Sequence, residues 1–142
     1  MQFLTKMLAL TRYLILSRQV KEVNRLIGEL PATAKRALGM LVAAEIQKAA
    51  QHPHPHLYGS EHVDRYQPWG DATEVALVRA RSDNAQLRLR GIATWIAVVF
   101  HETQNASHSG LQTVHRDVLG FMGDLKGTYA QAAVDRERQA AA

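Results

Sequence analysis

The stretch that decides the fold covers residues 71–104 and reads DATEVALVRARSDNAQLRLRGIATWIAVVFHETQ. Apolar or small residues recur in it at steps of three and four, which is a seven-residue repeat. The members of this repeat are Val75, Val78, Ser82, Ala85, Leu89, Ile92, Ile96, Val99 and Thr103. The repeat keeps its phase across Ser82–Asn84, so it predicts one continuous helix. Asp71 and Glu74 are typical of a capping pair at its start.

Three further segments also have helical patterns. Steps of four and three join the apolar residues Leu16, Val20, Val23, Ile27 and Leu30 into one stripe. Pro31 suits the first turn of the next helix, where a missing N–H costs nothing. With a later stripe from Leu111 to Tyr129, the sequence predicts helices near residues 3–30, 31–50, 71–104 and 109–135.

Residues 51–70 form the one long connection in this scheme. The segment holds Pro53, Pro55, Pro68, Gly59 and Gly70, and its His-Pro alternation disfavours a helix. A length of 142 residues fits one domain. We therefore predict an all-α fold for residues 1–142, an antiparallel helical bundle of about four helices with one long His/Pro-rich connecting loop.

Cysteine is absent from the chain, which excludes disulfide scaffolds, thiolate zinc sites and cysteine nucleophiles. The apolar start, residues 1–16, superficially resembles a signal peptide. However, Lys6 and Arg12 interrupt it, and no small-residue cleavage site follows. The uncharged run is also too short to span a bilayer. We expect a cytoplasmic protein.

The first four turns of the chain are apolar on nearly every side, so they need cover from a partner subunit, other helices or a membrane surface. The leading hypothesis is a non-enzymatic interaction or regulatory module. It would form a homodimer, or bind another protein, through the face around Leu4, Leu8, Leu14 and Ile15. A membrane-surface protein, with residues 1–20 lying in the interface, is a further alternative.

Basic residues are concentrated in the first third of the chain. Residues 1–50 hold eight Lys or Arg against three Glu, a charge of +5, while the remainder carries −1. The candidate basic residues are Arg12, Arg18, Lys21, Arg25, Arg79, Arg81, Arg88 and Arg90. They raise the alternative of nucleic-acid binding. The structural alternatives, which we favour, are a solvated polar face in the first third and, for the later four arginines, flanks of an apolar seam that their methylene groups cover.

Histidines near the long connection provide a candidate metal site. His52, His54, His56 and His62 lie in or beside the loop, and three imidazoles can hold zinc, nickel or copper. Histidines beside prolines are also ordinary surface residues. No nucleophile elbow or glycine-rich phosphate loop is present, so we predict no catalytic residue and no cofactor.

Overall fold

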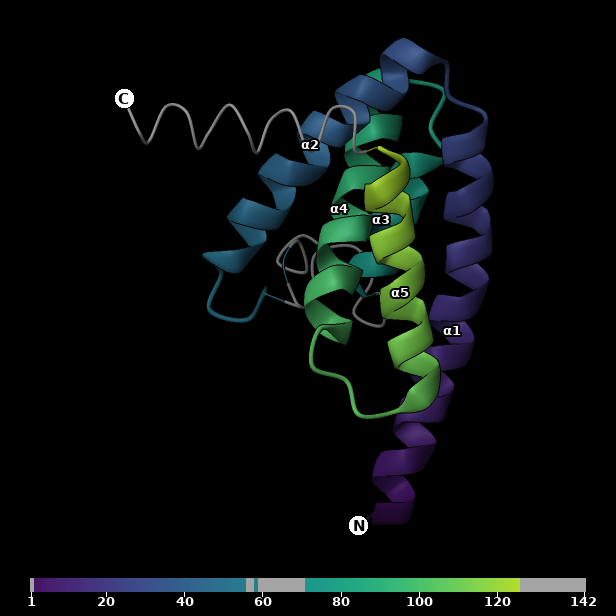
Figure 1. The fold of residues 1–142 in the computed structure, drawn as a ribbon, viewed down its shortest axis with the longest axis vertical. Coiled ribbons are helices and arrows are strands. Elements are labelled where there is room, and N and C mark those ends of the chain that lie inside the picture. The colour runs from purple at the N-terminus through teal and green to yellow at the C-terminus, as the bar shows by residue number, and fades with distance from the viewer. Residues whose placement is uncertain (1, 56–57, 59–70, 126–142) are drawn as a thin grey trace.

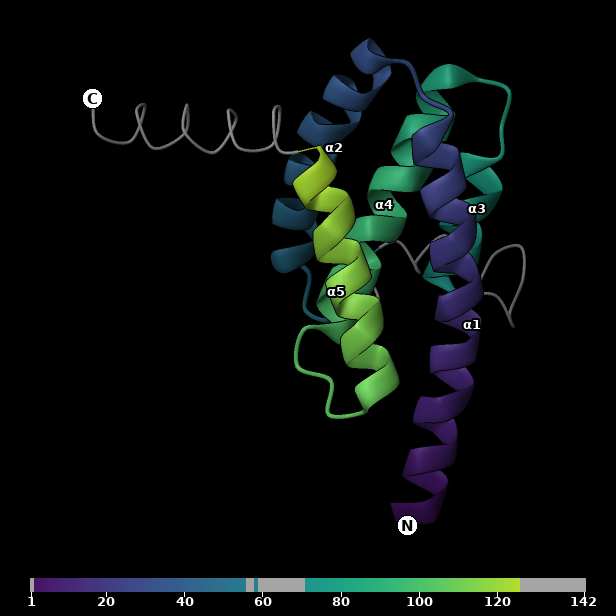
Figure 2. The same ribbon diagram turned by 45° about the vertical axis from the view of Figure 1, so that its right-hand side comes forward.

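The computed structural model describes residues 2–55, Tyr58 and residues 71–125, and this part of the chain is helical apart from its turns. The helices are α1 (Gln2–Gly28), α2 (Ala32–Ala50), α3 (Ala72–Ala80), α4 (Ala85–Thr103) and α5 (Ser109–Asp124). They pack around one apolar core, as two views of the bundle show (Figures 1 and 2). The all-α class predicted from the sequence is confirmed.

The central helix of the bundle is α4, which packs against α2, α3 and α5. Its residues 91–99 are buried without interruption. A helix covered on all sides needs apolar residues all round its axis, and the segment GIATWIAVV supplies them. Trp95 is fully buried and donates its Nε1–H to Gln19 Oε1 at 2.9 Å, which ties α4 to α1.

The predicted continuous helix over residues 71–104 is wrong, because the chain turns at Ser82–Asn84 and divides it into α3 and α4. The Asn84 side chain accepts a hydrogen bond from the backbone N–H of Leu87 at 3.0 Å and caps α4. Arg88 Nε donates to the Ser82 carbonyl at 3.0 Å and closes the turn. These polar groups stabilise a turn where the spacing of apolar residues alone predicts helix.

α3 and α4 pack closely because residue 91 is glycine. A Cβ atom there would lie 2.5 Å from the carbonyl oxygen of Ala76 and 2.9 Å from the Cα of Ala80. The side of α3 that faces the core also differs from the side expected for a continuous helix. Ala76 and Leu77 are buried, whereas Val78, a member of the predicted seam, is 64% exposed.

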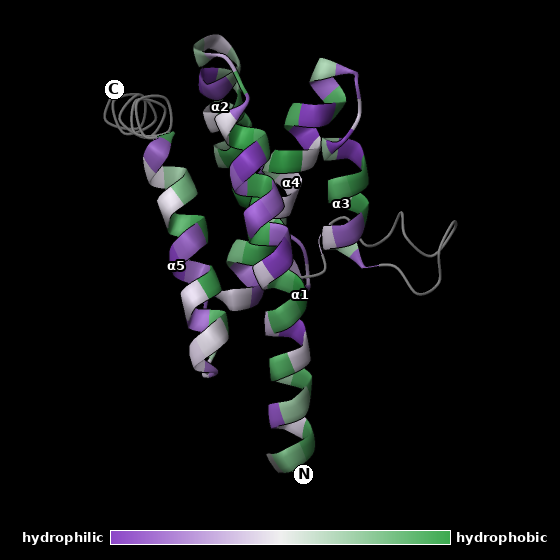
Figure 3. Cartoon of the chain, turned by 90° about the vertical axis from the view of Figure 1, so that its right-hand side faces the viewer, coloured by the Kyte–Doolittle hydropathy of each residue, from purple (hydrophilic) through white to green (hydrophobic). Residues whose placement is uncertain are grey.

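α1 lies along α5, and its first turns extend past the other helices (Figures 1 and 3). It buries Leu16, Val23, Leu26 and Ile27 in the core. Of the stripe that the sequence predicts in this region, Val114, Val118 and Leu125 are buried, and Leu111 and Met122 are half-buried. Phe121, which the predicted stripe did not include, is buried as well. The second half of α1 is therefore an ordinary amphipathic helix, and its first half is not.

Two predicted segments lie mostly or partly beyond the described residues. The loop predicted over residues 51–70 can be followed only at residues 51–55 and Tyr58, which are not α-helical. The last helix was predicted to extend to residue 135, and its part after residue 125 lies outside the described residues. Tyr58 donates its hydroxyl to the Glu45 carboxylate at 2.8 Å, which fastens it to α2. Within the described residues, none of the helices combines the length and the apolar character that crossing a membrane requires.

Candidate interaction surface

The first half of α1 exposes an unusual amount of apolar side chain. Six large residues there are between 48% and 76% exposed, and Figure 3 shows these turns projecting from the bundle. We call them the outward apolar face: Phe3, Leu4, Met7, Leu8, Leu10 and Leu14. Of the interaction residues expected from the sequence, Leu4, Leu8 and Leu14 belong to this face, whereas Ile15 is half-buried. Phe3, Met7 and Leu10 were not among those expected.

The outward apolar face lies on the opposite side of α1 from the core. With 3.6 residues per turn, the centre of the Phe3–Leu14 face is about 180° from the mean direction of Leu16, Val23 and Ile27. The apolar side of the helix therefore changes near residue 15. No rotation of a straight α1 can bury both sides in the same core. Residues 3–8 are exposed in any case, because the first turns of α1 extend past the other helices.

Arg12 fixes the rotation of α1 against the bundle. Its guanidinium donates Nε–H to Glu102 Oε1 at 2.5 Å and Nη2–H to Glu102 Oε2 at 2.8 Å, a bidentate pair. Its Nη1–H reaches Asp71 Oδ2 at 2.9 Å. Asp71 also caps α3 by accepting from the backbone N–H of Thr73 at 2.8 Å. One side chain thus joins α1 to the start of α3 and the end of α4.

Arg12 and Asp71 stay charged around neutral pH. Burial lowers the pKa of Arg12, but hydrogen bonds and charge from Glu102 and Asp71 outweigh burial, so its pKa is raised overall. Burial likewise raises the pKa of Asp71, but its hydrogen bond from Thr73 and the charge of Arg12 outweigh that effect, and its pKa is lowered overall. The three charges support one another.

Tyr13 makes a second contact that fixes the rotation of α1. Its ring lies 6.0 Å, centroid to centroid, from that of His108 at the start of α5. A Cβ at Gly110 would lie 2.6 Å from the Tyr13 ring, so a glycine is needed where the two helices meet. Arg12 and Tyr13 hold the polar side of the first half of α1 toward the bundle and leave its apolar side facing out.

The candidate basic residues do not form one surface. Besides Arg12, Arg81 pairs with Glu22 at 2.6 and 2.7 Å, and this hydrogen bond lowers the pKa of Glu22. Arg25 pairs with Glu29 at 3.0 Å.

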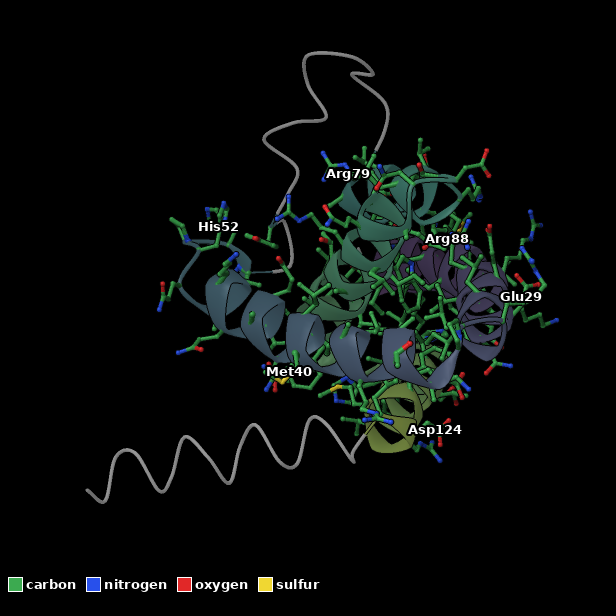
Figure 4. All side chains as sticks on the ribbon, turned by 90° about the horizontal axis from the view of Figure 1, so that it is seen from above. Glu29, Met40, His52, Arg79, Arg88 and Asp124 are labelled. Atoms are coloured by element: carbon green, nitrogen blue, oxygen red, sulfur yellow. The ribbon has the colours of Figure 1, made fainter. Side chains whose placement is uncertain are left out.

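The remaining candidates are spread over several elements. Arg18 and Lys21 are exposed on α1, while Arg90 is exposed on α4. Figure 4 shows Arg79 at the outer edge of α3 and Arg88 nearer the centre of the bundle, where it bonds the turn before α4. Among the candidate arginines, Arg12 and Arg81 join helices to one another and Arg88 closes a turn.

The candidate metal ligands are only partly described. His52 and His54 lie after the end of α2, where His52 Nδ1 accepts from the His54 backbone N–H at 3.1 Å. His56 and His62 lie outside the described residues. Across residues 2–55 and 71–125, no group of three or more His, Asp or Glu is placed to hold a metal ion.

Other polar side chains of the described core are also satisfied internally. The side chain of Thr103 donates to the Val99 carbonyl at 2.7 Å and lies 2.9 Å from His115 Nδ1. In the part of the chain that the structure describes, every buried side-chain nitrogen and oxygen has a hydrogen-bond partner.

No protein-family model matches the chain, and no curated protein or solved structure matches it either.

Proposed function

We propose that this chain is a non-enzymatic helical interaction module that self-associates through the outward apolar face of α1. The observation that carries the proposal is the change of apolar side within one helix. The second half of α1 buries Leu16 and Val23, and the first half presents Phe3 and Leu10 to solvent. A face of this kind is typical of a surface covered by a partner.

The area of the outward apolar face is adequate for an interface. With roughly 200 Å² for a large apolar side chain, its six members expose on the order of 700 Å² per chain. A stable interface buries about 800 Å² per partner. Contacts at this lower end of the range bind weakly, so we expect a dimer that dissociates at micromolar concentrations.

A second copy of the chain is the partner that this proposal names. Most soluble oligomers contain identical subunits related by a two-fold axis, and a single apolar helix face can serve both of them. The fixed rotation of α1, held by Arg12 and Tyr13, presents the face ready for contact. We place this assembly in the cytoplasm, because a chain without cysteine fits a reducing compartment.

Analytical ultracentrifugation of two matched lysine variants tests the proposal. Leu10→Lys puts a charge at the centre of the outward apolar face, and Val78→Lys makes a similar change at an exposed position on α3. From about 1 to about 200 µM, wild-type protein and Val78→Lys should dimerise alike. The dissociation constant of Leu10→Lys should rise at least about tenfold.

Circular dichroism of both variants controls for folding. A wild-type protein that stays monomeric over this range contradicts self-association. Equal weakening by Leu10→Lys and Val78→Lys contradicts the assignment to α1, because the two positions lie on different helices.

A further inference from the structure

Four members of the outward apolar face are spaced symmetrically along α1. Phe3, Met7, Leu10 and Leu14 follow one another at steps of four, three and four, which read the same in both directions. These four residues form a straight stripe of a coiled-coil type. The next two positions of the repeat are Ser17 and Lys21, so the stripe ends at Leu14.

A stripe that reads the same in both directions can meet its own copy in antiparallel orientation. If the two-fold axis passes beside the point midway between Leu8 and Ala9, Phe3 faces Leu14 of the second copy. Met7 then faces Leu10, and the same two contacts repeat on the other side of the axis. Every member of the stripe finds an apolar partner, and none faces a polar residue.

We propose that two copies of this chain pair through an antiparallel contact of their α1 helices, with Phe3 against Leu14 and Met7 against Leu10. This inference rests on the proposed self-association and adds its orientation and register. The paired segment is short, about 16 Å from Phe3 to Leu14. The two bundles then lie at opposite ends of the paired segment.

Charge favours this orientation over a parallel pair. Beyond Leu14, the outward side of α1 carries Arg18, Lys21 and Arg25, and all three are exposed. In a parallel pair these cations would face their own copies across the axis, and like charges at facing positions are unfavourable. In the antiparallel pair, the three cations of each copy lie beyond the paired segment. The full length of that segment then separates them from the three cations of the other copy.

The arrangement of the bundle is also compatible with the antiparallel pair. The first turns of α1 extend past the other helices (Figures 1 and 3), and residues 3–8 are exposed there. A second helix can therefore lie along these turns without displacing α5. In a parallel pair, the two five-helix bundles would have to lie next to each other on the same side of the contact.

A membrane surface is the competing occupant of this face. Interfacial helices draw on cations along their polar side. Here the polar side of residues 3–14 holds Lys6 and Arg12, and the charge of Arg12 is already bound by Glu102 and Asp71. The polar side therefore offers few cations to a lipid surface, which favours a second copy.

Single-cysteine variants test the orientation directly, because the chain has no cysteine of its own. Phe3→Cys and Leu14→Cys change only the ends of the stripe and leave Met7 and Leu10 in place. The two variants are mixed in equal amounts in a glutathione redox buffer. Disulfides between them are then counted by intact mass, which distinguishes the mixed dimer from either self-dimer.

A disulfide needs the two Cβ atoms about 4 Å apart. The antiparallel pair brings residue 3 next to residue 14 and keeps identical residues roughly 16 Å apart. The mixed disulfide should therefore exceed each self-disulfide at least about tenfold, whereas random collision gives about a twofold excess. Val78→Cys, mixed with either variant, serves as the control and should give only the random ratio.

The outcomes separate this inference from the proposed function. Dominant self-disulfides in a protein that sediments as a dimer would overturn the antiparallel orientation and leave self-association standing. A random ratio with dimeric wild-type protein would overturn the register. A monomer that sediments with phosphatidylcholine–phosphatidylserine vesicles would overturn both and assign the face to a membrane surface.

Discussion

Replacing Gly91 with alanine is a stringent test of the α3–α4 contact, which places Asp71 within reach of Arg12. The new Cβ would lie 2.5 Å from the carbonyl oxygen of Ala76. Ordinary contact begins about 1 Å farther away, so α3 would have to separate from α4 by about that distance. The obstructing atoms belong to the backbone and cannot turn aside as a side chain would.

The expected loss of stability follows from two opposing effects. Alanine is favoured over glycine in a helix by about 1 kcal/mol. Overpacking against backbone atoms costs about 3 kcal/mol, the upper end of the usual range. We therefore expect Gly91→Ala to lower the free energy of unfolding by about 2 kcal/mol. For a domain of this size, that lowers the Tm by about 6 °C.

Gly120 provides the matched control, because it also lies inside a helix. A Cβ there would meet nothing within 4 Å. Gly120→Ala should therefore show only the helix-forming advantage of alanine, a gain of about 0.5–1 kcal/mol. The same chemical change should thus raise the Tm at one position and lower it at the other.

Thermal and urea unfolding followed by circular dichroism measure both effects. All proteins should be compared at one concentration, because self-association adds to apparent stability. If Gly91→Ala is as stable as Gly120→Ala, the close contact of α3 with α4 is refuted. The turn at Ser82–Asn84 would then need another explanation.

Four further predictions concern the polar groups of the bundle. Arg12→Met should lower the free energy of unfolding in urea by about 2 kcal/mol, because it leaves partly buried carboxylates without their cation. An unchanged urea midpoint would contradict the role of Arg12 in joining α1 to α3 and α4. Trp95→Phe should cost about 1–3 kcal/mol, since the buried Gln19 loses its donor, and Trp95→Phe with Gln19→Leu should recover part of the loss. Burial lowers the pKa of His115 below its ordinary value of 6.5, so the neutral ring is favoured in the folded state. Stability should fall as the pH drops below 6.5, and His115→Asn should reduce this dependence in acid titrations. Asp71, whose pKa is also lowered, contributes stability above its ordinary value of 3.8 that is lost at more acidic pH, and Asp71→Asn should remove that part.

Several local features of the bundle could be predicted from the sequence, because their causes lie within a few residues. Pro31 ends one helix and begins the next, and the break between α1 and α2 is found there. Asp71 was expected to cap a helix, and its carboxylate accepts from the N–H groups of Thr73 and Glu74. The apolar stripe of α5 follows from helical periodicity alone.

The candidate interaction surface was predictable only in outline. An excess of apolar residues near the start of the chain indicated an uncovered face, and Leu4, Leu8 and Leu14 are exposed. The four-three-four spacing of the stripe from Phe3 to Leu14 is visible in the sequence and would have found the remaining members. Which side of α1 faces the core is not visible there, because it depends on how the whole helix packs.

The sequence by itself determined the helical class, the helix boundary at Pro31 and the cap at Asp71, since capping and periodicity act over a few residues. Only the tertiary structure decided between one helix over residues 71–104 and a turn at Ser82–Asn84. The apolar spacing and the local bonds of the turn favour opposite outcomes, and the close packing of α3 on α4 at Gly91 selects the turn. Tertiary packing also decided that Arg12 meets Glu102, 90 positions along the chain. Contacts over such a separation depend on how every helix between them packs, and here they turn the apolar start of α1 outward.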